Sequence, residues 1–382
     1  MRGDFKADDW LSAARVFRRT AGGQLSTQAG KLSRKLVPID VGAVRTDNRR
    51  ESDGYFRVAH KREDPTIFLT DEDGQFVDLL ADGTYRFQTY LTCLNNPIFV
   101  REALALIKRV MDKGADGVVI RYFRQEQQCH AEGRHIGFVK RKEDIYSEIP
   151  WMEQFDPMAL NLPTHKHVYP GKDQDDAFEK FIGKAKRLVK TYGPDKRLVL
   201  EADWKFSEKA DGFFVKSLLS DMDKIGKLRS RSAKPILVAT FPWEQCEEQD
   251  VSFAISTSWL YGFACVLPET VGSRLAGRLS KIDRGERRSD VLPLGVASGA
   301  IYENGIAVVN PSGSEAVVRL ELPKDYPSQN LLDVCTGQPA KVDSGTTITK
   351  SSVHDQAHQK RGFDLVARVP ARSGRFYYVQ HR

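Results

Sequence analysis

Carboxylates beside tryptophans are the side chains of this sequence best suited to chemistry. Asp203 precedes Trp204, and Glu244 follows Trp243. A carboxylate can act as an acid, a base or a nucleophile, and an indole ring beside it can stack on a sugar ring. Glu201 lies two residues before Asp203, so both side chains of an extended segment project to the same side, about 7 Å apart along the backbone. Asp203 and Glu244 are therefore the candidate catalytic pair.

Charged and imidazole side chains surround these carboxylates in the sequence pattern. Arg121 and Lys216 are predicted to face the same cavity, where they either bind an acidic group of a substrate or neutralise the carboxylates in salt bridges. Glu269 follows another strand candidate and is a further substrate-binding candidate. His165 and His167 alternate as a metal-chelating pair does, but no matching carboxylate motif accompanies them. We therefore predict no metal site, and the two histidines either contact substrate hydroxyls, as we assign them here, or lie on the surface.

The elements that must position these residues alternate between helices and strands. The buried strand predicted over 116–121 follows a helix that Asn96 caps, with Pro97 at its first position and Gly114 beyond its end. About eight such strand candidates occur. This rhythm predicts an α/β (β/α)8 TIM barrel over residues 35–290, a fold whose active site lies at the carboxyl ends of the strands.

The two ends of the chain have a different pattern. Short strand candidates separated by Gly, Pro, Asn and Asp predict a small all-β antiparallel sandwich over residues 291–382. Residues 1–34 are predicted as an N-terminal helix and a linker that pack on the barrel. The helix is predicted over residues 8–19 from apolar side chains with helical spacing, namely Trp10, Ala13, Ala14 and Phe17.

Composition narrows the classes of partner. The 382 residues carry a formal net charge of +7, with acidic residues interleaved among the basic ones. A solvated surface or an anionic partner such as an acidic polysaccharide explains this charge. No aromatic residues interleave with the basic runs in the way that stacks bases, which disfavours nucleic acid. The sequence leaves the oligomeric state open.

Several other kinds of site and location lack a sequence signal. No GxGxxG or GxxxxGK[ST] sequence occurs, so we predict no cofactor. The five cysteines are odd in number and widely spaced, which disfavours a zinc knuckle or a disulfide scaffold. The sequence contains no run of about 18 apolar residues, so it predicts no membrane span. The N-terminus shows no signal peptide, and the localisation stays unknown.

Four stretches carry a likeness to a known family. They lie at residues 9–18, at 95–97 with 114–118, at 165–170 with 192–196, and at 304–311. Together they resemble (β/α)8-barrel glycoside hydrolases with a C-terminal β-sandwich, of an uncharacterised bacterial type that acts on polysaccharides. Such relatives are typically exported, and they often carry a large β-sandwich before the first of these stretches, which is missing here.

The resemblance implies hydrolysis of the O-glycosidic bonds of a polysaccharide, neutral or anionic, by a pair of carboxylates. Two positions depart from the family pattern. Arg121 stands where the family commonly has its catalytic Asp, and Lys216 stands where it has Glu. The alternative is therefore a catalytically degenerate barrel that binds glycans or serves as a structural or assembly protein. Asp116 lies at the start of its strand, where a structural role is expected.

Overall fold

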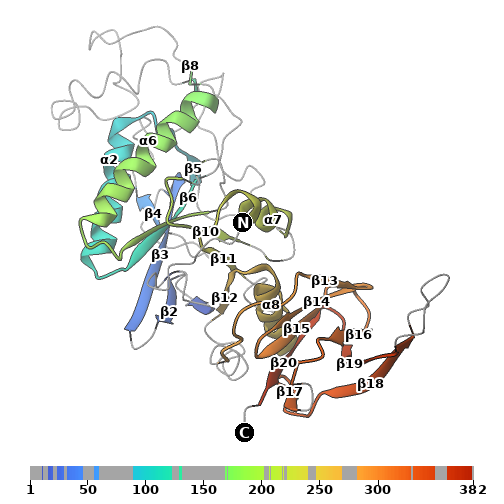
Figure 1. The fold of residues 1–382 in the computed structure, drawn as a ribbon. Coiled ribbons are helices and arrows are strands. Elements are labelled where there is room, and N and C mark those ends of the chain that lie inside the picture. The colour runs from blue at the N-terminus through green and yellow to red at the C-terminus, as the bar shows by residue number, and fades with distance from the viewer. Residues whose placement is uncertain are drawn as a thin grey trace, which may run out of the picture. The chain divides into compact units, whose positions relative to one another are not determined.

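The computed structural model forms two compact units (Figure 1). It describes residues 11, 16–19, 24–29, 32–45, 56–59, 89–122, 129–130, 168–169, 171–201, 206, 208–216, 218, 222–239, 247–268, 282–327, 330–348 and 359–380. The first unit takes its residues from 1–14, 19–215 and 223–235, and the second from 15–18, 216–222 and 236–382.

A parallel sheet is the centre of the first unit. Strands β3 (Leu32–Arg45), β6 (Gly117–Arg121), β9 (Arg197–Glu201) and β10 (Gly212–Val215) are neighbours in that order. On the other side of β3, the strand β4 (Phe56–Ala59) pairs with it in parallel. Every residue of β6 and β10 is buried, which is typical of a parallel sheet covered on both faces.

The strand β3 also pairs with two short antiparallel strands. The strand β2 (Leu25–Ala29) pairs with the start of β3, and β5 (Thr89–Leu91) pairs with the end of β3. The parallel ladder between β3 and β6 therefore stops at residues 40 and 121, and β3 continues beside β5. A separate ladder joins β7 (Cys129–His130) to β8 (Val168–Tyr169).

Helices α2 (Pro97–Asp112) and α6 (Gly171–Lys190) pack side by side in the first unit (Figure 1). The Asn96 Oδ1 accepts a hydrogen bond from the Phe99 amide at 3.3 Å, which caps the first turn of α2. Gly114 follows the helix with φ +83°, a left-handed conformation that favours glycine. The structure thus confirms the predicted helix, its cap and its end. Another helix, α7, runs over Met222–Arg231.

The second unit contains a β-α-β element. Strands β11 (Ile236–Ala239) and β12 (Ala264–Pro268) pair in parallel, and α8 (Glu248–Tyr261) connects them. The Glu247 and Asp250 side chains form a capping box at the start of α8. Residues 251–260 of α8 are all buried, so this helix packs on more than one side. It contacts the first of the antiparallel sheets that follow it in the chain.

Two antiparallel sheets form the rest of the second unit. One has the order β13-β14-β15-β20-β17 and the other β16-β19-β18. Inward-facing side chains of both sheets share one apolar cluster, as in a sandwich. The strands are β13 (Leu292–Leu294), β14 (Ala297–Tyr302), β15 (Gly305–Asn310), β16 (Ala316–Leu322), β17 (Leu331–Asp333), β18 (Lys341–Ile348), β19 (Gln359–Val369) and β20 (Ser373–Val379).

The broad fold prediction is confirmed, because parallel strands alternate with helices and antiparallel sheets follow. The complete (β/α)8 barrel and the domain limits remain predictions. The helix predicted over residues 8–19 is wrong over its last turn, where Val16–Arg19 form strand β1. Phe17 and Arg19 are buried and alternate with half-buried neighbours, and Arg18 Nη1 donates to the Pro268 carbonyl at 3.2 Å. Valine and phenylalanine also favour strands.

Candidate functional site

Three charged side chains lie side by side where three parallel strands of the first unit end their pairing. Asp40 of β3 is the register partner of Arg121 on β6. The ladder between β6 and β9 runs through Ile120 and Leu200, which immediately precede Arg121 and Glu201. Residues in register on neighbouring strands project from the same face of a sheet. We call Asp40, Arg121 and Glu201 the strand-end row.

The strand-end row is held by ion pairs. The Arg121 Nε lies 3.8 Å from the Asp40 Oδ2 and 4.0 Å from the Glu201 Oε2. Arg121 is 7% exposed and Asp40 is fully buried, while the Glu201 side chain is 15% exposed. The other oxygen of Asp40 accepts the Gly42 amide at 2.9 Å, which orients its carboxylate. The row thus combines two carboxylates with one guanidinium.

The spacing of the two carboxylates is of chemical interest. Since both oxygens lie within 4.0 Å of one nitrogen, Asp40 Oδ2 and Glu201 Oε2 are less than about 8 Å apart. Glycoside hydrolysis uses carboxyl groups about 5–9.5 Å apart, one of which must donate a proton. The protonated form of a carboxyl group is favoured by burial among apolar side chains or by a second carboxylate nearby. Here the cation of Arg121 lies between the carboxylates of Asp40 and Glu201. The row therefore supplies negative charge and hydrogen-bond acceptors, and a proton donor has to come from elsewhere.

Aromatic packing fixes the chain just after the row. The Tyr122 ring stacks on Phe178 of α6 at 4.3 Å, and Phe178 meets Phe206 edge-on at 5.0 Å. The Tyr122 hydroxyl donates to Oε1 of the buried Gln174 at 3.3 Å. The first turns of α6 thus pack against the residue that follows Arg121, which restrains the end of β6.

The opposite ends of the same strands carry a structural network. Asp116 accepts hydrogen bonds from Arg34 Nη1 at 3.0 Å, Lys196 Nζ at 2.8 Å and the Lys35 amide at 2.9 Å. Burial acts to raise the pKa of Asp116, but the bonds from Lys196, the Lys35 amide and Arg34 outweigh it and lower that pKa. This confirms the structural role expected for Asp116.

A second carboxylate joins the helices to the sheet of the first unit. Asp211 accepts the Leu198 amide at 2.9 Å and pairs with Lys186 at 3.0 Å and Lys190 at 3.4 Å. Burial acts to raise the pKa of Asp211, but the Leu198 amide and the two lysines lower it overall. Because all its oxygens face α6 and β9 partners, Asp211 anchors the helix to the sheet.

Of the predicted site residues that the structure describes, Arg121 and Glu201 meet in the strand-end row. Lys216 is exposed and belongs to the second unit, so its predicted place in the same cavity stays a prediction. The other predicted site residues lie outside the described residues: Asp203, Glu244, Trp204, Trp243, Glu269, His165 and His167. The sequence analysis missed Asp40, whose signal is a lone carboxylate inside the apolar stretch Leu36–Val41.

Neither a metal-binding cluster nor a membrane-spanning helix occurs among the described residues. No group of three or more His, Cys, Asp or Glu side chains there is arranged to hold a metal ion. None of the helices in the described part of the chain has the length and apolar character needed to cross a bilayer.

Comparisons with known proteins give a distant likeness to carbohydrate enzymes. No family model and no curated protein matches the sequence. An alpha-amylase from Geobacillus thermoleovorans is 10% identical with a TM-score of 0.43, covering 91% of this chain and 77% of its own. A debranching enzyme from Nostoc punctiforme is 10% identical with a TM-score of 0.41, covering 81% and 68%.

A third solved structure is considerably longer than this chain. A cycloisomaltooligosaccharide glucanotransferase from Paenibacillus sp. is 12% identical with a TM-score of 0.33, and the match covers 90% of this chain. The chain spans only 43% of the length of that enzyme. The identities of these three enzymes to the chain are 10–12%, and their TM-scores lie between 0.33 and 0.43.

Proposed function

We propose that this chain is a glycoside hydrolase-like (β/α)8-barrel protein that hydrolyses O-glycosidic bonds of a polysaccharide, with Asp203 and Glu244 as its carboxylate pair. The strand-end row is the observation that carries the proposal. Replacing buried ion pairs by packed apolar side chains is often neutral or stabilising, so stability alone does not call for three charges there. The carboxyl ends of parallel strands are where barrel enzymes bind their substrates.

In this proposal the row forms part of the sugar-binding surface. Glu201 is its most exposed member, and it lies two residues before Asp203 in the chain. A carboxylate there accepts hydrogen bonds from sugar hydroxyls and opposes the positive charge that develops on the sugar ring during hydrolysis. Asp203 and Glu244 then divide the remaining roles, one as a proton donor and the other as a nucleophile or base.

The charge of the row also bears on the substrate. Arg121 already faces two protein carboxylates, so it carries no surplus positive charge for an acidic sugar. A sugar carboxylate or sulfate next to this row would meet two protein carboxylates that already face one guanidinium. We therefore propose that the sugar beside the row is neutral, while acidic groups of an anionic polysaccharide lie on other sugars of the chain.

A second candidate function is glycan binding without catalysis. The observation that favours it is Arg121, which stands at the strand end where the resemblance implies a catalytic carboxylate, and which pairs there with Asp40 and Glu201. A barrel that has lost its chemistry can keep such an ion-paired row as a binding surface. Hydrolysis and binding therefore have to be measured separately.

A screen of neutral and acidic polysaccharides separates the two candidates. Reducing-end release is measured beside retention on the immobilised polysaccharide, for the wild type and for Asp203→Asn and Glu244→Gln. Matched controls are Asp290→Asn and Glu321→Gln, which change exposed carboxylates of the second unit. We expect each site variant to lose at least about 100-fold in rate and the controls to keep theirs.

Two other results would change the assignment. Hydrolysis that survives both Asp203→Asn and Glu244→Gln would show that the carboxylate pair is a different one. Retention on a polysaccharide without any release of reducing ends would favour the non-catalytic function.

A further inference from the structure

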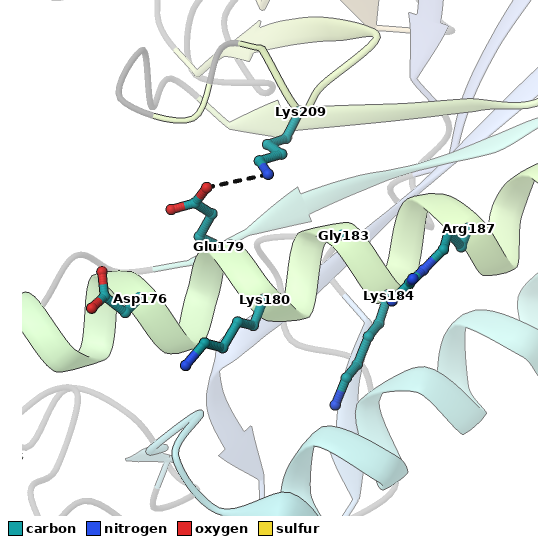
Figure 2. A pocket seen from close by; sticks show the side chains of 7 residues that line it. All are labelled: Asp176, Glu179, Lys180, Gly183, Lys184, Arg187 and Lys209. Atoms are coloured by element: carbon teal, nitrogen blue, oxygen red, sulfur yellow. Dashed lines mark ion pairs between the residues drawn. The ribbon is translucent and has the colours of Figure 1, made fainter.

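The outward face of α6 carries a hollow of about 610 Å³ that belongs to the first unit (Figure 2). Its volume is within the range of pockets that hold small ligands. Most of its lining side chains are basic and none is aromatic. The lining residues are Asp176, Glu179, Lys180, Gly183, Lys184, Arg187 and Lys209.

Three of the basic side chains form a stripe on α6. Lys180, Lys184 and Arg187 are spaced at i, i+4 and i+7, so they follow one face of the helix over about 10 Å. All three are exposed, and none of their side chains makes a hydrogen bond or an ion pair with another residue of the described ranges. Like charges at this spacing repel one another, so the stripe costs helix stability unless an anion binds to it.

The acidic residues of the hollow offset only part of the charge of the stripe. Glu179 pairs with Lys209 at 3.2 Å, so these two charges balance each other. Figure 2 shows Lys180 and Lys184 pointing to the side of α6 away from that ion pair. Asp176 is the one other acid in the lining, which leaves the hollow with a net charge of +2.

Gly183 leaves open space in the middle of the hollow. It lies inside α6, where glycine costs up to about 1 kcal/mol relative to alanine. A Cβ atom at Gly183 would meet no atom of the described residues within 4 Å, so their packing does not require a glycine. By contrast, a Cβ at Gly117 would lie 2.1 Å from the Arg197 carbonyl oxygen. The missing side chain at Gly183 keeps the floor of the hollow open.

We propose that this hollow binds an acidic oligosaccharide segment, whose carboxylate or sulfate groups pair with Lys180, Lys184 and Arg187. The choice of a glycan rests on the proposed function, while the positive charge and the open floor are properties of the hollow itself. The lack of aromatic side chains in the lining disfavours single-stranded nucleic acid, which is bound by base stacking.

The charge of the stripe is tested with polygalacturonate as a carboxylate probe, dextran sulfate as a sulfate probe and dextran as a neutral control. Affinities are measured at low salt for the full chain and for a variant with Lys180→Gln, Lys184→Gln and Arg187→Gln. The control variant, Lys113→Gln, Lys227→Gln and Lys324→Gln, removes the same charge from other exposed positions. We expect the α6 variant to lose about tenfold or more in affinity for an acidic probe and the control less than about twofold. Equal losses in both variants would overturn the proposal.

A second variant tests the shape of the hollow without changing its charge. Gly183→Gln fills the open floor and should weaken binding of the acidic probe about tenfold while the free energy of unfolding rises or stays constant. Gly226→Gln is the matched control, because a Cβ at that glycine of α7 also meets no described atom within 4 Å. The proposal would be overturned if Gly183→Gln bound the acidic probe with the affinity of the wild type. It would also be overturned if duplex DNA bound more tightly than the acidic probe through the same three side chains.

The results also separate this proposal from the proposed function. Binding of an acidic probe that depends on the stripe, in a protein that releases no reducing ends, would refute hydrolysis alone. If the protein hydrolyses a polysaccharide but its binding of the acidic probe does not depend on the stripe, only the α6 site is refuted.

Discussion

Replacing Arg121 by methionine removes the cation of the strand-end row while keeping a side chain of similar length. Breaking a buried ion pair by removing one partner costs about 3–5 kcal/mol, because a buried charge is left without compensation. Asp40 is fully buried here, but the Nε–oxygen distances of 3.8 and 4.0 Å are long for ion pairs. We therefore expect Arg121→Met to lower the free energy of unfolding by about 3 kcal/mol, the low end of that range.

Asp40→Asn added to Arg121→Met should restore much of this loss. The amide oxygen can still accept the Gly42 amide, and no buried charge remains at that position. A double-mutant cycle should therefore give a coupling of about 2 kcal/mol between residues 40 and 121. Urea denaturation followed by circular dichroism measures each free energy.

Arg368→Met is the matched control for this cycle. Arg368 forms an equally long ion pair with Glu315 at 3.9 Å, but its side chain is 79% exposed, so its loss should cost less than about 0.5 kcal/mol. A change of less than about 0.5 kcal/mol in Arg121→Met, or no recovery in the double variant, would refute the account of the row as a buried ion cluster.

Three further changes test other parts of the structure. Asp116→Ala should lower the free energy of unfolding by about 2–3 kcal/mol at pH 7, whereas the exposed Asp290→Ala should change it little. Because the pKa of Asp116 is lowered in the folded state, its contribution to stability is complete above about pH 4 and is lost as the pH falls through the folded value. The difference between the urea midpoints of wild type and variant should therefore shrink in acid. Asn96→Ala should lower the free energy of unfolding by about 1 kcal/mol and Asn96→Asp by less, as measured in urea, and equal losses would contradict the cap. Burial raises the pKa of the Cys265 thiol to about 12, so iodoacetamide at pH 8 should alkylate Cys265 only in denatured protein. Peptide mass mapping measures the labelling, and rapid labelling of the native protein would contradict the burial of Cys265.

Local sequence signals predicted the parts of the fold that local interactions determine. The helix α2 has a capping asparagine, a proline at its first position and a glycine beyond its end, and each acts within a few residues. The alternation in β16 likewise separates its buried from its exposed side chains. Residues Val16–Arg19 were mispredicted because their apolar spacing suits a helix as well as a strand, and the buried Arg19 conceals the alternation.

The strand-end row depends on register, which no local signal gives. Arg121 and Glu201 stood out as charged residues after apolar strands, but Asp40 lies within a strand that continues to Arg45. Only the pairing of β3 with β6 places Asp40 beside Arg121. A register shifted by one residue would turn its carboxylate to the other face of the sheet. The candidate pair Asp203 and Glu244 stays a prediction.

The claim that the strand-end row belongs to a sugar site is tested most directly by the affinity of Glu201→Gln for the polysaccharide that gives the strongest signal in the screen. This substitution keeps the shape of the side chain and leaves Arg121 paired with Asp40. Titration calorimetry should show binding weakened about tenfold or more relative to the wild type, because a hydrogen bond to a charged group contributes about 1.5–3 kcal/mol. An affinity equal to that of the wild type would contradict the claim.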